Sequence, residues 1–185
     1  DGTKYVGDIK DGKLHGWGQL VDADGPRYIG QWVDGLKHGW GWDKDKSLGG
    51  EYQGAFINGK RHGKGWFVYD NGIIYDGAWQ NDLPEGKGIM WFAEGGKYEG
   101  NFKEGLFDSK GTLFDHDGTG GIEVGAWRDG KPVSIIRWVR EPTGIVHTTL
   151  IESMNQAQTA FSRREITLDE GLRRVGMKRP PSFDD

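Results

Sequence analysis

Large aromatic residues alternate with glycine and polar residues in short stretches along most of the chain. Within residues 52–56 an aromatic residue, a glycine and a second aromatic residue alternate with glutamine and alanine, which is the two-residue period of a β-strand. Asn58-Gly59 follows, a pair that favours a tight hairpin turn because both residues tolerate a left-handed backbone. Residues 60–67 then resume the alternation. The pattern predicts a β-hairpin.

This pattern recurs, and each copy opens on Tyr-x-Gly. The copies begin at Tyr5, Tyr28, Tyr52, Tyr75 and Tyr98, at intervals of 23, 24, 23 and 23 residues, and a degraded sixth copy begins at Glu123-x-Gly125. A period of this length is typical of a repeat array, in which each unit depends on its neighbours for stability. The predicted fold class is mainly β: an elongated, twisted antiparallel sheet of stacked hairpins over residues 1–130, followed by a C-terminal α-helical tail.

Paired glycines in the second strand of each hairpin predict how neighbouring units pack. The pairs are Gly16/Gly18, Gly39/Gly41, Gly63/Gly65 and Gly86/Gly88. Because a glycine inside a strand usually marks the close approach of another group, each pair is expected to leave a trough on one face, across which aromatic rings of a neighbouring strand lie. The expected rings, together with Ile9 in the first copy, are those of Tyr5, Tyr28, Trp32, Tyr52, Phe56, Tyr75, Trp79, Tyr98 and Phe102.

A second set of aromatic residues has the opposite parity and predicts a functional surface. It comprises Trp17, Trp40, Trp42, Trp66 and Trp91, which share their face with Lys64 and Lys87. Two interpretations stay open: the tail covers these residues and makes them core, or they line a groove for a helix or an extended peptide of a partner protein, since Trp anchors dominate interface energies. A β-bulge would exchange the two faces.

Beyond the array the periodicity changes. Residues 131–147 are expected to form a capping strand and linker, residues 148–176 two helices, and residues 177–185 a mobile tail. Leu150, Met154, Ala157 and Phe161 form an apolar stripe at helical spacing, and Thr167 with Glu170 forms a capping box. The stripe is expected to dock on the array's own sheet; the alternative is pairing with another chain.

Composition narrows the classes of function. The chain has 33 glycines and no cysteine, so disulfides and thiolate metal sites are excluded, which suits a reducing compartment. Residues 1–130 hold 15 basic and 21 acidic residues, whereas residues 131–185 hold nine and seven. A net-acidic array attracts nucleic acid poorly. No apolar run approaches the 18 residues typical of a membrane span.

Candidate chemistry is sparse, and we predict no catalytic, cofactor or metal site. His15, His38 and His62 recur with the repeat; a structural role is favoured over a metal ladder because no carboxylate or second His converges on each one. Asp115-x-Asp117 resembles the start of a calcium loop, but Ala126 stands where the bidentate Glu is needed. No nucleophile–base pair stands out.

Tyr28-x-Gly30-x-Trp32 followed by His38-Gly39-x-Gly41 resembles the MORN repeat, as do residues 52–65. The resemblance covers about residues 1–130. It implies a twisted antiparallel sheet with a groove and a scaffold or adaptor role in cytoskeletal, ciliary or membrane-contact assemblies. Copies four and five depart from the pattern: Glu85 and Asp108 replace the His, and Ser109 replaces the first paired Gly.

The order of an array and a C-terminal helix is similar to the retinophilin-like branch of that family, which implies a motor partner, the tail of a class III myosin. We therefore expect a non-enzymatic cytoplasmic adaptor, associated with the cytoskeleton or a cilium, that binds a protein partner. The alternative is a peripheral membrane module that binds anionic phospholipids. Self-association through edge strands or the tail helix is a third alternative. The chain starts within the repeat pattern, and we therefore interpret it as a possible excised fragment.

Overall fold

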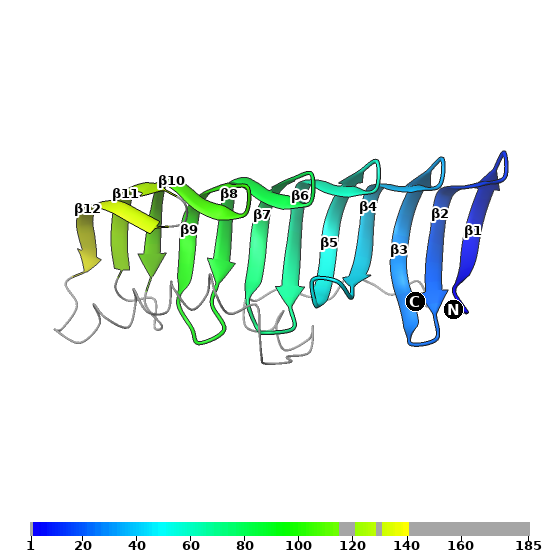
Figure 1. The fold of residues 1–185 in the computed structure, drawn as a ribbon, viewed down its shortest axis with the longest axis horizontal. Helices are drawn as coiled ribbons and strands as arrows, with labels where there is room; N and C mark the ends of the chain where they lie inside the picture. Colours follow the sequence, from blue (N-terminus) through cyan, green and yellow to red (C-terminus); the bar gives the residue numbers. More distant parts are fainter. Residues whose placement is uncertain (1, 115–120, 129–130, 141–185) are drawn as a thin grey trace.

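A computed structural model describes residues 2–114, 121–128 and 131–140. In this part the chain forms one open antiparallel sheet of twelve strands, each hydrogen-bonded to the next in sequence order, and the strands stand side by side in an elongated row (Figure 1). The strands are β1 Lys4–Lys10, β2 Lys13–Asp22, β3 Gly25–Val33, β4 Leu36–Asp45, β5 Gly50–Ile57, β6 Lys60–Tyr69, β7 Ile74–Gln80, β8 Leu83–Trp91, β9 Lys97–Lys103, β10 Leu106–Phe114, β11 Gly121–Arg128 and β12 Lys131–Arg140. The prediction of a mainly β sheet of hairpins is confirmed.

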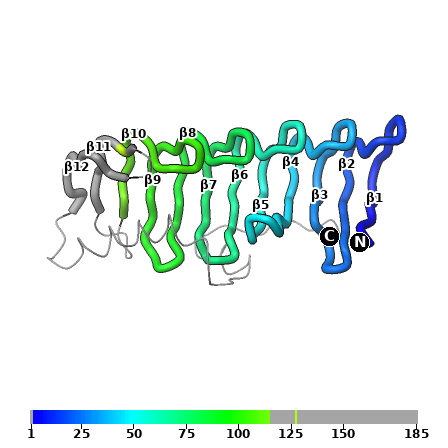
Figure 2. The backbone as a smooth tube through the Cα atoms, in the orientation of Figure 1, coloured from blue at the N-terminus to red at the C-terminus, as the bar shows by residue number. Residues whose placement is uncertain are grey.

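The hairpin turns adopt the backbone that their sequences predict. Asn58 and Gly59 have φ of 51° and 83°, and Asn81 and Asp82 have φ of 50° and 74° although no glycine is present in that turn. The second to fifth turns are also bonded to the hairpin before them: the N–H of Gly59 donates to Lys37 O at 2.8 Å, and that of Asp82 donates to Arg61 O at 3.1 Å. The turns therefore lie in a row at one end of the strands (Figure 2), and a repeated hydrogen bond joins neighbouring hairpins there.

The strand register places two repeated rows across one face of the sheet. One row alternates the repeat tyrosines with residues of the second strands, so that Tyr52 opposes Asp43 on one side and Phe67 on the other. The next row on the same face, two residues along each strand, is glycine throughout strands β1–β10 and consists of Gly7, Gly18, Gly30, Gly41, Gly54, Gly65, Gly77, Gly88, Gly100 and Gly111. A Cβ added at Gly65 would lie 2.2 Å from the Tyr52 hydroxyl, so only glycine leaves space for the ring.

The tyrosine rings form the core of the inner face, the face toward which this Cβ would point. Tyr28, Tyr52, Tyr75 and Tyr98 are completely buried. Each meets an aromatic ring of its own repeat and one of the next repeat edge to face, as Tyr52 meets Phe56 at 5.0 Å and Trp79 at 5.2 Å between centroids. Edge-to-face pairs are the favoured aromatic geometry. The rings thus connect successive hairpins into one continuous core.

Each tyrosine also ties its hydroxyl to the backbone. The hydroxyl of Tyr52 donates to Ala55 O at 3.0 Å, and that of Tyr75 donates to Ala78 O at 2.8 Å. Burial in this apolar face, where the ionised form is poorly solvated, raises the pKa of Tyr28, Tyr52 and Tyr75 well above its usual range. The inner face is therefore stable only with neutral tyrosines.

The predicted glycine troughs are wrong in one respect, the face of the first glycine. The second glycine of a pair, such as Gly65, lies beneath the tyrosine of the neighbouring strand in its hairpin, as predicted. The first glycine does not share that face: Gly16, Gly39, Gly63 and Gly86 have φ of 60°, 58°, 67° and 80°, at the point where the hairpin register shifts. Each is a bulge residue, and a left-handed bulge turns it toward the opposite face.

The sixth copy is displaced by one residue from its prediction. Ile122 opposes Leu113 and Val124 opposes Gly111, so the Tyr and Gly positions fall on Ile122 and Val124 and not on Glu123 and Gly125. Register shifts between β11 and β12 follow on both sides of Val124. They bring Trp127 back to the inner face, where it is 4% exposed and 5.4 Å from the Tyr98 ring.

Several sequence expectations lie outside the described residues. These are the helices of residues 148–176 with the stripe Leu150, Met154, Ala157 and Phe161, the tail of residues 177–185, and the calcium-like segment at Asp115–Gly120. Within the described ranges, no helix has the length and apolar character needed to cross a bilayer.

Candidate partner-binding groove

The outer face, opposite the tyrosines, carries one exposed side chain per repeat at the same place in the register. This position lies between the bulge residue and the glycine row in each second strand, and we call its five residues the outer ladder. Trp17 opposes Gln31, Trp40 opposes Ala55, Lys64 opposes Ala78, and Lys87 opposes Asn101; Lys110 follows by the repeat period. The ladder therefore changes from Trp to Lys between the second and third repeats.

In the two Trp repeats a polar side chain fills the space beside the bulge. The Asp8 carboxylate accepts a hydrogen bond from the backbone N–H of Trp17 at 3.2 Å, and the Gln31 amide oxygen accepts one from the backbone N–H of Trp40 at 3.1 Å. The side chains of Trp17 and Trp40 are each 46% exposed. The Trp half of the outer face is thus a closed floor with two exposed aromatic side chains.

In the repeats of Lys64 and Lys87 the same space is open, whereas Asn101 holds this position beside Lys110. Ala55 and Ala78 stand where Asp8 and Gln31 stand in the earlier repeats. A Cβ added at Gly63 would meet nothing closer than Ala55 Cβ at 3.5 Å. Over strands β6–β10 the surface consequently forms an open groove of about 670 Å³.

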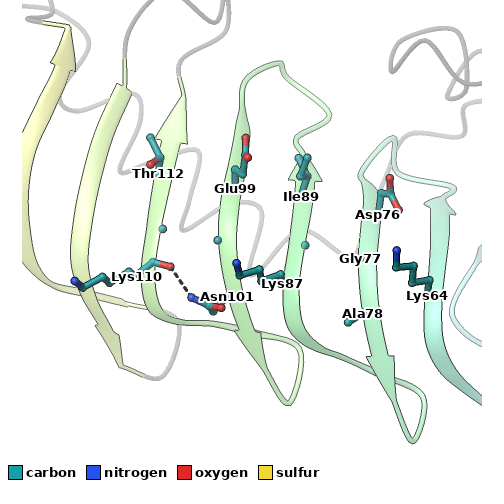
Figure 3. A pocket seen from close by; sticks show the side chains of 13 residues that line it. Lys64, Asp76, Gly77, Ala78, Lys87, Ile89, Glu99, Asn101, Lys110 and Thr112 are labelled. Atoms are coloured by element: carbon teal, nitrogen blue, oxygen red, sulfur yellow. Dashed lines mark hydrogen bonds between the residues drawn. The ribbon is translucent and has the colours of Figure 1, made fainter.

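The groove has a floor of backbone and small side chains and a regular pattern of charge. Figure 3 shows Lys64, Lys87 and Lys110 on strands β6, β8 and β10, with Asp76 and Glu99 on the strands between. On the floor the Asn101 amide donates to Lys110 O at 3.1 Å. The ion pairs of the described residues that involve lysine are formed by other lysines, those at positions 37, 46 and 97.

Asp76 is a half-buried acid of the groove. Desolvation by burial raises the pKa of its carboxyl, and the nearby Lys64 ammonium partly opposes the rise. Its cross-strand partners are Trp66 and Ile89, so large apolar side chains flank it. A ligand that brings an ammonium or a hydrogen-bond donor to Asp76 would offset the cost of this desolvation.

The predicted binding residues do not form one row. Trp17, Trp40, Lys64 and Lys87 belong to the outer ladder and are exposed. Trp42, Trp66 and Trp91 lie further along the strands: Trp66 is 7% exposed, and Trp42 and Trp91 are half-buried. The Trp42 indole N–H donates to the Glu51 carboxylate at 3.1 Å. The ladder residues are therefore the predicted residues that a partner reaches most easily, and Trp66 is part of the packed sheet.

The three repeat histidines stand next to the bulge glycines. His15 Nδ1 lies 4.0 Å from the Asp34 carboxylate. Among the residues that the structure describes, no three His, Cys, Asp or Glu side chains gather in a group able to hold a metal ion.

Sequence reasoning missed Lys110 and the inner-face role of Arg61. Lys110 completes the ladder, and its 23-residue spacing from Lys87 was the signal, hidden because Ser109 interrupts the glycine pair. Arg61 is 6% exposed and lies against Asp82 Oδ1 at 3.2 Å and Asp45 Oδ2 at 3.4 Å. Its guanidinium also lies 5.0 Å from the Trp79 ring centroid. It therefore joins repeats two, three and four on the inner side.

Comparison with known proteins bears on the array alone. The family model described as MORN repeat matches residues 5–27, 28–42, 52–74, 75–97 and 98–120, which are the five copies that begin at the repeat tyrosines. A comparison with curated proteins finds no match to the chain.

Proposed function

Because the chain belongs to the MORN-repeat family, we propose that it is a non-enzymatic scaffold that binds a segment of a partner protein along the outer face of its sheet. MORN repeats are often modules of protein or membrane interaction. The observation that carries the proposal is the outer ladder: two indoles, each 46% exposed, continue into a groove of about 670 Å³.

The shape of the surface supports a long and narrow contact. Each repeat adds two strands and so roughly 10 Å of length, which gives the five repeats a surface of roughly 50 Å. Trp side chains anchor many protein interfaces because they bury a large area with little loss of side-chain entropy. A segment lying across the strands would meet one ladder residue per repeat.

The finer identity of the partner is also a proposal. We place the protein in a cytoplasmic assembly of the cytoskeleton, of a cilium or of a membrane contact, with a cytoskeletal or motor protein as partner, as the retinophilin-like likeness implies.

The test is capture of a partner by variants of the full chain. Trp17→Ala with Trp40→Ala removes both exposed indoles; Trp66 is left intact because its burial would confuse loss of binding with loss of folding. The matched control is Leu36→Ala with Leu106→Ala, which removes two apolar side chains, 48% and 43% exposed, at the hairpin ends.

We expect quantitative mass spectrometry of the captured proteins to show a partner that is retained by wild type and by the leucine control but lost from the tryptophan variant. Equal capture by all three proteins would refute binding at the indoles.

Binding of anionic phospholipid is the alternative, and the three ladder lysines favour it. Against it stand Asp76 and Glu99 in the same groove and the excess of acidic residues over residues 1–130. Co-sedimentation with vesicles of phosphatidylcholine, with and without phosphatidylserine, separates the two functions, because only lipid binding would need the anionic lipid and weaken with salt.

A further inference from the structure

We infer that the outer face selects a partner segment whose apolar end lies on Trp17 and Trp40 and whose acidic end lies on Lys64, Lys87 and Lys110. The inference rests on the proposed function and adds to it the chemistry of the segment: an extended stretch of protein with carboxylates at every third residue.

The first step is that the fold does not require the change from Trp to Lys. All five ladder residues precede a member of the glycine row, and that row continues without interruption from Gly7 to Gly111. The tyrosines beneath the row are likewise the same residue in all five repeats. Since the exposed ladder side chains do not support this core, their identities are available for recognition.

The second step is that the change in the ladder coincides with a change in the surface around it. Asp8 and Gln31 close the floor beside the indoles, because their side chains accept hydrogen bonds from the backbone N–H groups of Trp17 and Trp40. Ala55 and Ala78 leave the floor open beside Lys64 and Lys87, and the groove lies over this half. The face therefore has an aromatic half and a hollow, lysine-lined half, and a segment that fits both needs two different ends.

The third step is spacing. Ladder residues recur every two strands, about 9.6 Å apart. A polyproline-type extended segment presents every third residue on one side at about 9.3 Å, whereas a helix presents every seventh at about 10.5 Å. Over the four intervals of the ladder, the summed side-chain spacing of the extended segment differs from that of the ladder by about 1 Å, and that of the helix differs by about 4 Å. The spacing therefore favours an extended segment with acidic residues three apart.

The fourth step excludes a uniform anionic surface. Asp76 and Glu99 lie beside the lysine row, two residues further along the strands, where they oppose Trp66 and Ile89, so a continuous layer of negative charge would face repulsion as well as attraction. A segment with acids opposite the lysines, and neutral or basic side chains toward Asp76 and Glu99, meets attraction in both rows. This arrangement also fixes the position of the segment across the face, because a shift along the strands brings its acids toward Asp76 and Glu99.

The experiment selects peptides from a random displayed library on the immobilised 185-residue chain. Three proteins are compared: wild type, the ladder variant Lys64→Glu/Lys87→Glu/Lys110→Glu, and the control Lys13→Glu/Lys60→Glu/Lys103→Glu. The control makes the same change of charge at exposed lysines at the hairpin ends. Denaturation curves of the three proteins establish that they are folded, and Gln replaces Glu in the ladder variant if it is not.

We expect wild type and control to enrich peptides with acidic residues at three-residue spacing beside a cluster of aromatic or aliphatic residues. A synthesised peptide of this kind should bind the ladder variant at least about tenfold more weakly than wild type. Replacement of its acids by lysine should restore binding to the ladder variant.

The remaining outcomes distinguish failure of the inference from failure of the proposed function. Enrichment of peptides that lack the acidic spacing, or that bind the ladder variant as well as wild type, overturns the inference and leaves the proposed function intact. Failure of every peptide to enrich on wild type overturns the proposed function. Binding of wild type, but not of the ladder variant, to phosphatidylserine vesicles without competition from peptide overturns the inference in favour of a membrane surface.

Discussion

The two faces of one sheet obey different rules. On the inner face the repeats are nearly identical: the same tyrosine lies over the same glycine in all five, because any added atom would collide with the ring. On the outer face the ladder changes from Trp to Lys within a register that stays the same. The repeated residues therefore carry the fold, and the residues free to differ between repeats are those to which we assign recognition in the proposed function.

Alkaline pH should break the inner face most strongly, because it acts on all its tyrosines together. Their folded-state pKa is raised by burial, so their contribution to stability is complete below the unfolded pKa of about 10 and is lost as pH rises above it. Each titrating tyrosine lowers the free energy of unfolding by about 1.4 kcal/mol per pH unit in that window.

The measurement is urea denaturation at pH 8 and at intervals above pH 10, with tyrosinate absorbance followed in parallel. The tyrosines should ionise only as the sheet unfolds. Gradual ionisation in a sheet that stays folded would show that the rings are accessible and contradict the packing.

Adjacent residues on opposite faces give the sharpest contrast. Gly65→Ala places a Cβ 2.2 Å from the Tyr52 hydroxyl and should lower the free energy of unfolding by about 3 kcal/mol, at the upper end for overpacking. Lys64→Ala, one residue away on the outer ladder, should change it by less than about 0.5 kcal/mol. Chemical denaturation followed by Trp fluorescence measures both. Comparable losses in the two variants would mean that the faces do not divide their roles.

Arg61 tests whether one inner contact joins three repeats. Arg61→Met leaves Asp45 and Asp82 without their cation and removes the contact with Trp79, at a cost of about 2 kcal/mol. This estimate lies below the range for a fully buried pair because Asp82 is 41% exposed. A double-mutant cycle with Asp82→Asn measures the coupling between the two residues. A coupling near zero would assign the loss to packing alone.

Ser109 predicts the smallest effect, and it is a gain. Ser109 holds the bulge position with φ of 51°, where the other repeats have glycine, and a left-handed backbone is unfavourable for residues with a Cβ. Ser109→Gly should therefore raise the free energy of unfolding by about 1 kcal/mol, less the weak hydrogen bond that its exposed hydroxyl donates to Asp108. A loss of stability on this substitution would show that the bulge does not select glycine.

Local signals predicted the repeat and its turns, but not that the two glycines of each pair have different roles. Asn58-Gly59 carries its geometry in residue type because glycine and asparagine tolerate the left-handed backbone, and Tyr-x-Gly does so because only glycine leaves space for the ring. The bulge at Gly63 could not be read, because a glycine has the same letter whether it provides space for a ring or a positive φ. Arg61 was missed for a related reason: its carboxylate partners come from other repeats, and only the stacked sheet brings them together.

The most direct test of the division between the faces is to locate the bound partner by photo-crosslinking. A photoreactive amino acid is placed at Ala78 on the groove floor, and separately at Lys13 on a hairpin end as the control. We expect a crosslinked adduct with the captured partner from position 78 and none from position 13. Adducts from position 13 alone would place the partner at the hairpin ends and contradict binding along the outer face.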